Sequence, residues 1–182
     1  MAILPIVIHP DDRLRTICAA VTSFDAALAT VVSDMFETMY DAPGRGLAAP
    51  QVGVLQRLFV FDSDWKDAET RNPRVMVNPE VLWTSEETQD YTEGCLSIPD
   101  TPCRLSRPAR ITMRWQDLDG QTFEDTFDGI TAVVVQHEFD HLDGVLIIDR
   151  PALPIPAPED APVQDDAQGV AQDQPAATAE TA

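Results

Sequence analysis

Residues 136–142, with the sequence QHEFDHL, constrain this chain more than any other segment. They hold two of its three histidines, His137 and His141, four positions apart. Residues four apart share one face of an α-helix, so both imidazole rings can point at a single ion. Glu138 follows the first histidine and places a carboxylate beside that point, as in helical HExxH sites with a general base. The pattern predicts a metal-binding helix that still needs a third protein ligand.

The helix that carries this motif is expected to begin near Ile130 and to lie in the centre of the fold. Residues 133–135 are valines, which are poor helix formers in isolation. A helix that is apolar on nearly every side is usually buried. Gly144 is a natural stop for this helix, and the apolar residues 145–148 are expected to return to the core.

The remaining elements predict an α+β fold with antiparallel β-sheets wrapped around the central buried helix. Apolar side chains recur at three and four positions through residues 23–40, which predicts an N-terminal core helix that Ser23 can cap. Asp119 and Gly120 predict a hairpin turn. Short antiparallel strands with only two good helices are typical of α+β proteins. The expected β segments are residues 3–8, 57–61, 75–77, 109–115 and 122–127.

Charge and composition exclude several kinds of protein. With 12 basic and 31 acidic residues the formal charge is -19, so binding to a phosphate backbone is not expected. Three cysteines are an odd number, which argues against a disulfide framework and suits the cytoplasm. No run approaches the ~20 apolar residues of a membrane span, and no targeting segment is recognised.

The composition changes sharply at residue 151. Residues 151–182 contain six prolines, six acidic residues and no Lys, Arg or aromatic residue. Such a segment cannot bury enough apolar surface to offset its ordering entropy. We therefore expect one catalytic domain over residues 1–150 and a disordered acidic tail over residues 151–182.

The third protein ligand of the metal is expected to lie outside the helix that carries His137 and His141. Metalloproteases with HExxH usually recruit it downstream, but no histidine follows His141, and the acids beyond Asp149 lie in the predicted tail. Cys95, preceded by glycine, is the better candidate because a thiolate binds zinc- or iron-type ions well. A Cys-His-His set leaves one tetrahedral position open, as catalytic sites do. A zincin-type peptidase with a downstream ligand remains the alternative.

Residues 44–53, GRGLAAPQVG, have almost no side-chain bulk. Small residues let another backbone approach closely, whether that of a substrate or of a neighbouring strand. A tight turn between a helix and a strand would explain the same composition. Gln51 is the one functional side chain among small or fixed residues.

Three segments together resemble peptide deformylase. GRGLAAPQ at residues 44–51, EGCLS at 93–97 and QHEFDH at 136–141 look like its three motifs, in order and at similar intervals. The resemblance covers about residues 3–150. It implies a metal-dependent hydrolase that removes the N-formyl group from the formyl-methionine of nascent proteins and releases formate. The alternative within this resemblance is a divergent protein with a changed substrate or weak activity.

The resemblance also implies the roles of individual residues. The metal, usually Fe²⁺ in cells with Zn²⁺, Ni²⁺ or Co²⁺ able to replace it, would lower the pKa of a bound water. Glu138 would act as general base, and the Gln51 amide and the Leu96 N–H would hold the oxyanion. The implied metal ligands are Cys95, His137 and His141.

The peptide is expected to bind as an added strand. The resemblance places the backbone of Arg45, Gly46 and Gly94 along it, with Gly46 among the catalytic residues, and Val134 with Leu96 in the methionine pocket. Position 45 is commonly aliphatic in this family, so Arg45 is expected to bring a charge to the pocket rim. Pro102 stands where many members carry an arginine. Implied partners are formyl-methionyl nascent peptides and a transient ribosome contact, without nucleic-acid or membrane binding.

Overall fold

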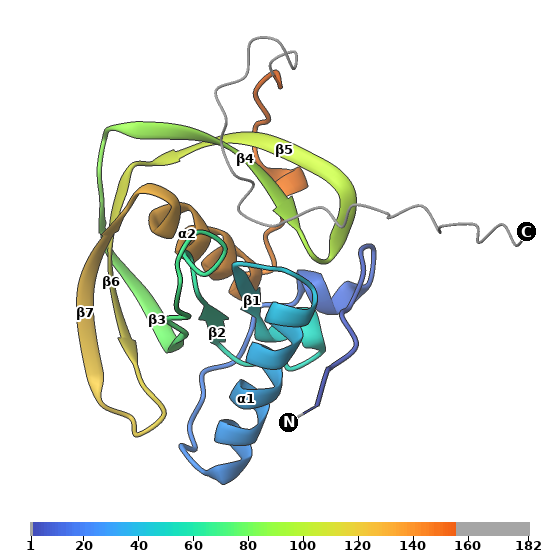
Figure 1. The fold of residues 1–182 in the computed structure, drawn as a ribbon, viewed down its shortest axis with the longest axis vertical. Coiled ribbons are helices and arrows are strands. Elements are labelled where there is room, and N and C mark those ends of the chain that lie inside the picture. Colours follow the sequence, from blue (N-terminus) through green and yellow to red (C-terminus); the bar gives the residue numbers. More distant parts are fainter. Residues whose placement is uncertain (1, 156–182) are drawn as a thin grey trace, which may run out of the picture.

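The computed structural model describes residues 2–155, which form two antiparallel sheets and two long helices (Figure 1). One sheet has five strands in the order β1-β2-β3-β6-β7, and β4 pairs only with β5. The predicted α+β class with antiparallel sheets is confirmed. The strands are β1 (Gly46–Ala48), β2 (Leu58–Phe61), β3 (Arg74–Thr84), β4 (Thr88–Cys95), β5 (Ile98–Pro108), β6 (Arg110–Gln116) and β7 (Thr122–Asp128), and the helices are α1 (Ala26–Asp41) and α2 (Gly129–Leu142), with the short 3-10 helices η1 (Asp12–Arg15), η2 (Ala49–Val52) and η3 (Ile147–Asp149).

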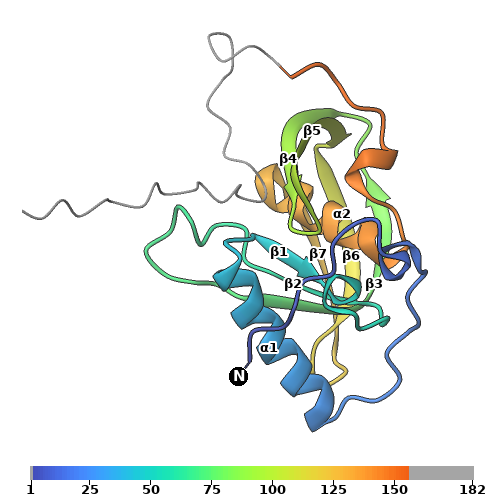
Figure 2. The ribbon, with the colours of Figure 1, turned by 90° about the vertical axis from the view of Figure 1, so that its right-hand side faces the viewer.

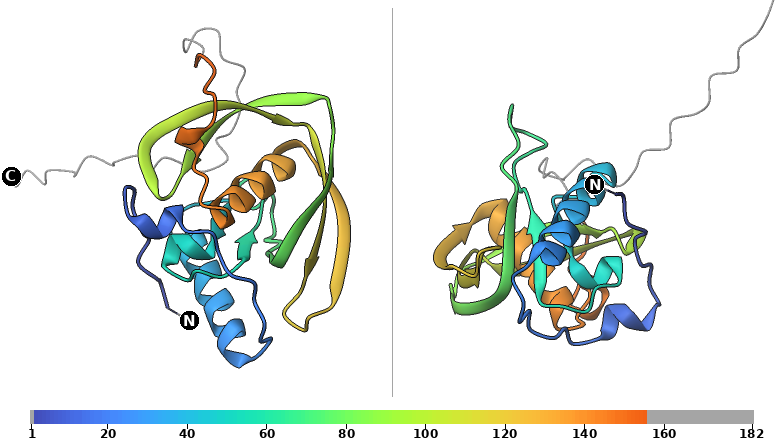
Figure 3. Two further views of the ribbon diagram at one scale, coloured as in Figure 1. Left: turned by 180° about the vertical axis from the view of Figure 1, so that it is seen from behind. Right: turned by 90° about the horizontal axis from the view of Figure 1, so that it is seen from below.

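Helix α2 lies in the centre of the fold, with the long strands and the β4–β5 hairpin curving around it (Figures 1 and 3). Val133, Val134 and Val135 are at most 1% exposed. They belong to one apolar cluster with strand residues such as Phe59 and Met113. Burial on several sides therefore outweighs the weak helix propensity of three consecutive valines. The predicted central helix is confirmed, although it begins at Gly129, one residue early.

Helix α1 packs against the other side of β1 and β2 (Figure 2). Met35 and Met39 are fully buried there, which agrees with the predicted core helix. The predicted cap is wrong: the carboxylate of Asp25, not Ser23, accepts from the N–H groups of Ala27 and Leu28 at 2.9 and 3.0 Å. The helix therefore begins three residues later than its apolar periodicity suggests.

Strand β3 is longer than predicted, since it continues through Asn78 and Pro79 to Thr84. Asn78 takes a positive φ of 51°, and the pairing of β3 with β6 shifts between Val77 and Glu80. The Asn78 amide bonds the backbone of Val21 at 2.8 and 2.9 Å, which stabilises this conformation. The Asn-Pro signal thus marks an irregularity inside a strand and not its end.

Other sequence predictions have mixed outcomes. The hairpin from β6 to β7 is confirmed. Residues 3–8 join no sheet, although the Val7 N–H donates to the Gln51 carbonyl at 2.7 Å. The apolar segment 145–148 does return to the core, with Leu146 and Ile147 buried, and it enters η3. Neither helix within residues 2–155 is long and apolar enough to cross a membrane.

The predicted tail lies mostly outside the described residues, which end at residue 155. The first part of that segment is described and contacts β5. The Leu153 N–H donates to the Arg104 carbonyl at 2.7 Å, and the Arg104 guanidinium bonds the Pro154 carbonyl at 3.1 Å. Residues 151–155 therefore dock on the β4–β5 hairpin.

Candidate metal centre

Helix α2 and the end of β4 bring three potential metal ligands together. Cys95, His137 and His141 each offer one donor atom, and these atoms lie within 4.8 Å of one another. The Cys95 sulfur is 3.3 Å from Nε2 of His141. All three side chains are buried, at 5%, 2% and 1% exposure. The structure therefore assembles the three residues proposed as ligands from the sequence.

The hydrogen-bonding state of the two imidazoles fits a bound cation. Nε2 of His137 and Nδ1 of His141 are buried and have no hydrogen-bond partner among the described residues. A buried nitrogen without a partner costs free energy, and a ligated metal ion would satisfy the His137 nitrogen. One sulfur and two imidazole nitrogens form a donor set suited to Zn²⁺ or Fe²⁺-type ions.

A buried carboxylate orients the first histidine. The Nδ1–H of His137 donates to Glu93 at 2.9 Å, and Arg107 bonds the same carboxylate at 2.5 and 2.9 Å. Burial opposes the charged form of Glu93, but the bonds from His137 and Arg107 lower its pKa to about 2. A metal-binding histidine commonly uses its second nitrogen in this way, which fixes the ring.

The same network continues outward from Arg107. Its guanidinium also bonds Asp140 at 3.0 Å, and Asp140 accepts from Arg150 at 2.6 Å. Sequence reasoning missed this network. Glu93 was recognised only as part of the EGCLS segment, and its partner Arg107 comes from the next strand, β5.

The histidines have opposite pKa shifts. Burial lowers the pKa of His137, but the Cys95 sulfur and Glu93 outweigh it and raise this pKa well above its ordinary value. Burial and the charges of His137 and Arg107 lower the pKa of His141. Because a metal binds only the deprotonated nitrogen, a cation at the site would compete with the proton on His137.

Glu138 is fully buried beside Gly46. A Cβ added at Gly46 would lie 2.8 Å from both Cγ and Cδ of Glu138, so only glycine allows the side chain this position. Burial raises the pKa of Glu138 to about 7. A carboxyl group with a pKa near neutrality can both accept and return a proton at physiological pH.

Gln51 joins the small-residue segment to the metal centre. Its side-chain oxygen accepts from the Ala48 N–H at 2.8 Å, and its amide nitrogen donates to the Ser97 hydroxyl at 3.2 Å. The same nitrogen lies 3.7 Å from the Cys95 sulfur. Gln51 and Ser97 are both fully buried. The functional side chain singled out in the sequence is thus held beside the proposed ligands.

The other predicted site residues surround this centre. Gly94 is buried on β4, Leu96 is partly buried after it, and Val134 is 1% exposed on α2. The Arg45 guanidinium is not an exposed charge: the side chain is 1% exposed and bonds the Ser63 carbonyl and the Asp67 carboxylate.

Two further residues lie outside the cluster of three ligands. His9, the third histidine of the chain, is partly buried. Pro102 is exposed on β5. All three cysteines are free, as their odd number predicts.

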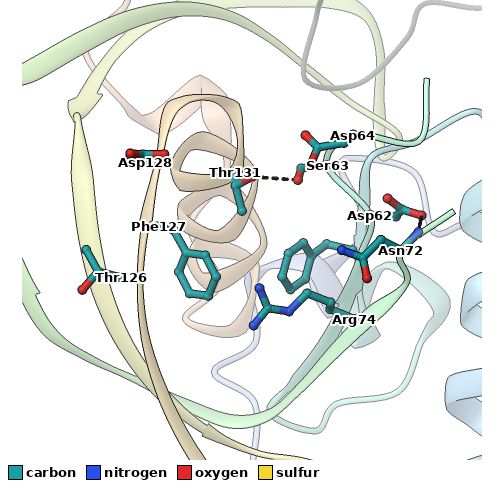
Figure 4. Close-up of a pocket in the computed structure, with 10 residues that line it drawn as sticks. Asp62, Ser63, Asp64, Asn72, Arg74, Thr126, Phe127, Asp128 and Thr131 are labelled. Carbon is teal, nitrogen blue, oxygen red and sulfur yellow. Dashed lines mark hydrogen bonds between the residues drawn. The ribbon is translucent and has the colours of Figure 1, made fainter. Parts of the chain in front are cut away.

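A cavity of about 150 Å³ lies elsewhere, between the loop after β2 and the start of α2 (Figure 4). None of the predicted site residues lines it. Its wall includes Asp62, Ser63, Asn72, Arg74 and Thr131.

Two helix-borne histidines, a cysteine from a strand and a buried carboxylate define the centre of a metal-dependent hydrolase. The sequence profile described as polypeptide deformylase matches residues 3–154. The chain belongs to the polypeptide deformylase family. Its activity is therefore removal of the N-formyl group from formyl-methionine at the start of nascent proteins.

Individual relatives agree with this assignment. Peptide deformylase of Novosphingobium aromaticivorans is 49% identical over 168 residues, covering 82% of this chain and 89% of that protein. The enzyme of Rhizorhabdus wittichii is 50% identical over 154 residues, covering 82% of this chain and 87% of its own. The crystal structure of peptide deformylase from Thermotoga maritima matches with a TM-score of 0.79 and 42% identity, over 84% of this chain and 100% of that one.

Proposed function

We propose that Cys95, His137 and His141 hold the catalytic metal ion of this deformylase. The convergence of their donor atoms within 4.8 Å, beside a buried Glu138, is the observation that carries the proposal. We further propose Fe²⁺ as the ion in cells, with Zn²⁺, Ni²⁺ or Co²⁺ able to take its place, because a mixed sulfur and imidazole site accepts each of them. When bound, such an ion supplies Lewis acidity and lowers the pKa of water.

Glu138 is the general base in this proposal. Its buried carboxyl group, whose pKa is raised by that burial, would take a proton from the attacking water and return that proton to the leaving amine. Its full burial keeps bulk water away from the carboxyl group. Gly46 belongs to the catalytic set because its missing side chain leaves room for this carboxyl group.

The amide of Gln51 and the backbone N–H of Leu96 are proposed to stabilise the negative charge that develops on the formyl oxygen. Gln51 is held on both sides, by Ala48 and by Ser97, so its amide is fixed before substrate binds. Donors that are already oriented contribute most to such stabilisation, because they do not reorganise during the reaction.

The peptide substrate is proposed to add as a strand beside the backbone of Arg45 and Gly46, opposite Gly94. β1 is the first strand of its sheet, so its second edge is not covered by another strand of that sheet. Strand addition at such an edge needs main-chain bonds and little side-chain bulk. We place the methionine side chain against Val134 and Leu96.

The biological setting follows from this substrate. The partners are formyl-methionyl nascent chains, with transient ribosome contact, in the cytoplasm. Nucleic-acid binding is not expected, because acidic residues outnumber basic ones 31 to 12. We assign catalysis to a domain over residues 1–150 and treat residues 151–182 as a tail, of which we expect residues 156–182 to be dispensable.

Formate release from formyl-Met peptides under anaerobic conditions tests these assignments, with Fe²⁺- or Ni²⁺-loaded protein. Glu138→Ala should keep the metal and lose hydrolysis, because the base is not a ligand, whereas Cys95→Ala should lose the metal. Metal content and formate are measured on the same samples. Loss of metal from Glu138→Ala, or full metal retention by Cys95→Ala, would contradict the roles assigned here.

A further inference from the structure

The loop between β2 and β3 forms hydrogen bonds with Gly44 and Arg45, which lead into the strand proposed to bind the peptide. The Trp65 indole N–H donates to the Gly44 carbonyl at 2.8 Å, and the Asp62 N–H donates to the Arg45 carbonyl at 2.9 Å. The Arg45 guanidinium bonds the Ser63 carbonyl and, at 2.9 Å, the Asp67 carboxylate. The loop of residues 62–73 thus bonds the carbonyls of Gly44 and Arg45 and the Arg45 guanidinium, whereas the Gly44 N–H donates to the Met39 carbonyl of α1 at 2.8 Å.

The loop has its own internal support, centred on Tyr40 of α1. The Tyr40 hydroxyl donates to Asp62 at 2.7 Å, and the Asn72 N–H donates to the same carboxylate at 2.8 Å, which closes the base of the loop. The Trp65 ring meets the Tyr40 ring edge-on at 5.3 Å, and the Arg71 guanidinium lies 3.8 Å above the Tyr40 ring. These contacts give the loop a defined conformation that connects α1 with residues 44–45.

The opposite flank of the loop is only weakly attached. The cavity of about 150 Å³ lies there, and both ends of the loop line it (Figure 4). The hydroxyl groups of Ser63 and Thr131 bridge the gap at 2.7 Å, as the dashed line in Figure 4 shows. The loop is thus joined to α2 by this hydroxyl pair and to residues 44–45 by the bonds described above.

The metal centre marks the end of the strand at which a bound peptide reacts. Gln51, whose amide nitrogen lies 3.7 Å from the Cys95 sulfur, accepts from the Ala48 N–H, and Glu138 lies beside Gly46. The rest of the peptide therefore leads away from Ala48 along the strand. If the peptide docks as proposed above, the residues after methionine pass Arg45 and Gly44, where the loop supports the strand.

We propose that the loop of residues 62–73 is a substrate-positioning element, with Trp65 and Arg45 as its positioning residues. It holds the backbone of residues 44–45 in the place where the second and later residues of a formyl-peptide bind. It touches neither the metal ligands nor Glu138. The loop therefore sets the affinity for longer formyl-peptides and leaves the chemical step unchanged. This inference rests on the proposed strand-like docking of the substrate.

Trp65→Phe tests the inference, because it removes the indole N–H and keeps an aromatic ring beside Tyr40. The Gly44 carbonyl is buried and would lose its donor, which is expected to raise KM about tenfold for a formyl-Met tetrapeptide. KM for formyl-methionine, which lacks a second residue, should change less than about twofold, and kcat should stay unchanged for both. Tyr40→Phe, which removes the hydroxyl bond to Asp62, should shift KM in the same direction by a smaller factor.

The matched control is Trp83→Phe, the same substitution on β3, where the 48% exposed ring lies beside Arg110. It should leave both parameters and both substrates unaffected. A tetrapeptide KM equal to that of the wild type in Trp65→Phe, or an equal fall in kcat for short and long substrates, would overturn the inference while leaving deformylation intact. Absence of formate release by the wild type would instead refute the function assigned to the site.

Discussion

Substituting Gly46 with alanine tests the packing that places the general base. An added Cβ would lie 2.8 Å from Cγ and Cδ of Glu138, and closer still to Oε1. Carbon atoms in contact normally stay about 3.5–4.0 Å apart, so the Glu138 side chain would have to move by roughly 1 Å. Glu138 is fully buried on a central helix, and its neighbours Ala48 and His137 are at most 2% exposed. Displacing the carboxyl group is therefore expected to disturb its packing against these buried neighbours.

The expected effect on catalysis is large and the effect on stability moderate. A 1 Å displacement of a catalytic group costs on the order of 100-fold in rate. Overpacking of a filled core costs about 1–3 kcal/mol of folding free energy. Since the three atoms nearest to the added methyl group all belong to Glu138, which is not a proposed ligand, metal content should stay at the wild-type level.

The comparison variant is Gly44→Ala in the same segment. Its added Cβ would meet Cδ1 of Leu96 at 2.9 Å, the far end of a flexible side chain, and the Gly46 carbonyl oxygen at 3.1 Å, and neither atom belongs to Glu138, so a smaller loss is expected. The assay is kcat for formate release from metal-loaded protein, with metal content and Tm measured on each variant. A Gly46→Ala enzyme within threefold of the wild-type kcat would refute the argument that the missing side chain at position 46 positions Glu138.

Three further predictions concern the surroundings of the site. Glu93→Gln should weaken metal affinity by about 10–100-fold, measured by competition with a chelator, because it weakens the bond that orients His137; an unchanged affinity would contradict that role. Removal of residues 156–182 should change Tm by less than about 2 °C and leave kcat/KM intact, because chain termini contribute few contacts; a larger fall in Tm would contradict it. Asp149→Asn should lower Tm at pH 7, because Arg15 bonds Asp149 and holds its pKa below the ordinary 3.8. That stabilisation is present at pH values above the ordinary pKa of Asp149 and is lost as the pH falls through its pKa in the folded protein. The Tm values of the variant and the wild type should therefore converge in acid, and a constant difference between them would contradict the assignment.

Local sequence patterns predict several helices and strands of the core, but they do not predict every strand. Apolar periodicity predicts α1 and alternation predicts β6, because both depend on which face of an element is buried, and the Asp119-Gly120 turn predicts β7 as the partner of β6. The β4–β5 hairpin was not predicted. Strand β4 contains Gly94 and β5 contains Pro99 and Pro102, and both strands are largely polar and partly exposed, so neither propensity nor alternation marks them. Their pairing is a tertiary property.

The missing hairpin explains which parts of the site sequence reasoning found. Cys95 could be proposed because two histidines lacked a third ligand, and Gln51 because it is the one functional side chain among small neighbours. Glu93 had no such signal, since its role depends on Arg107, which comes from the next strand and lies beside it only after the hairpin forms. A missing metal ligand can be recognised in the sequence, because two histidines alone do not complete a metal site. A residue that only orients a ligand leaves no such gap.

Arg45 shows the same limit for a single side chain. An arginine in a segment of small residues next to the substrate was expected to bring a charge to the pocket rim. Its guanidinium instead lies 1% exposed between the Ser63 carbonyl and Asp67. Burying a charge is costly unless it is paired and hydrogen-bonded, so the position of Arg45 requires the loop of residues 62–73 to be in place. The charge at position 45 is thus used to attach a loop to the substrate-binding strand, and no pattern within residues 44–53 could have revealed a partner that comes from residues 62–73.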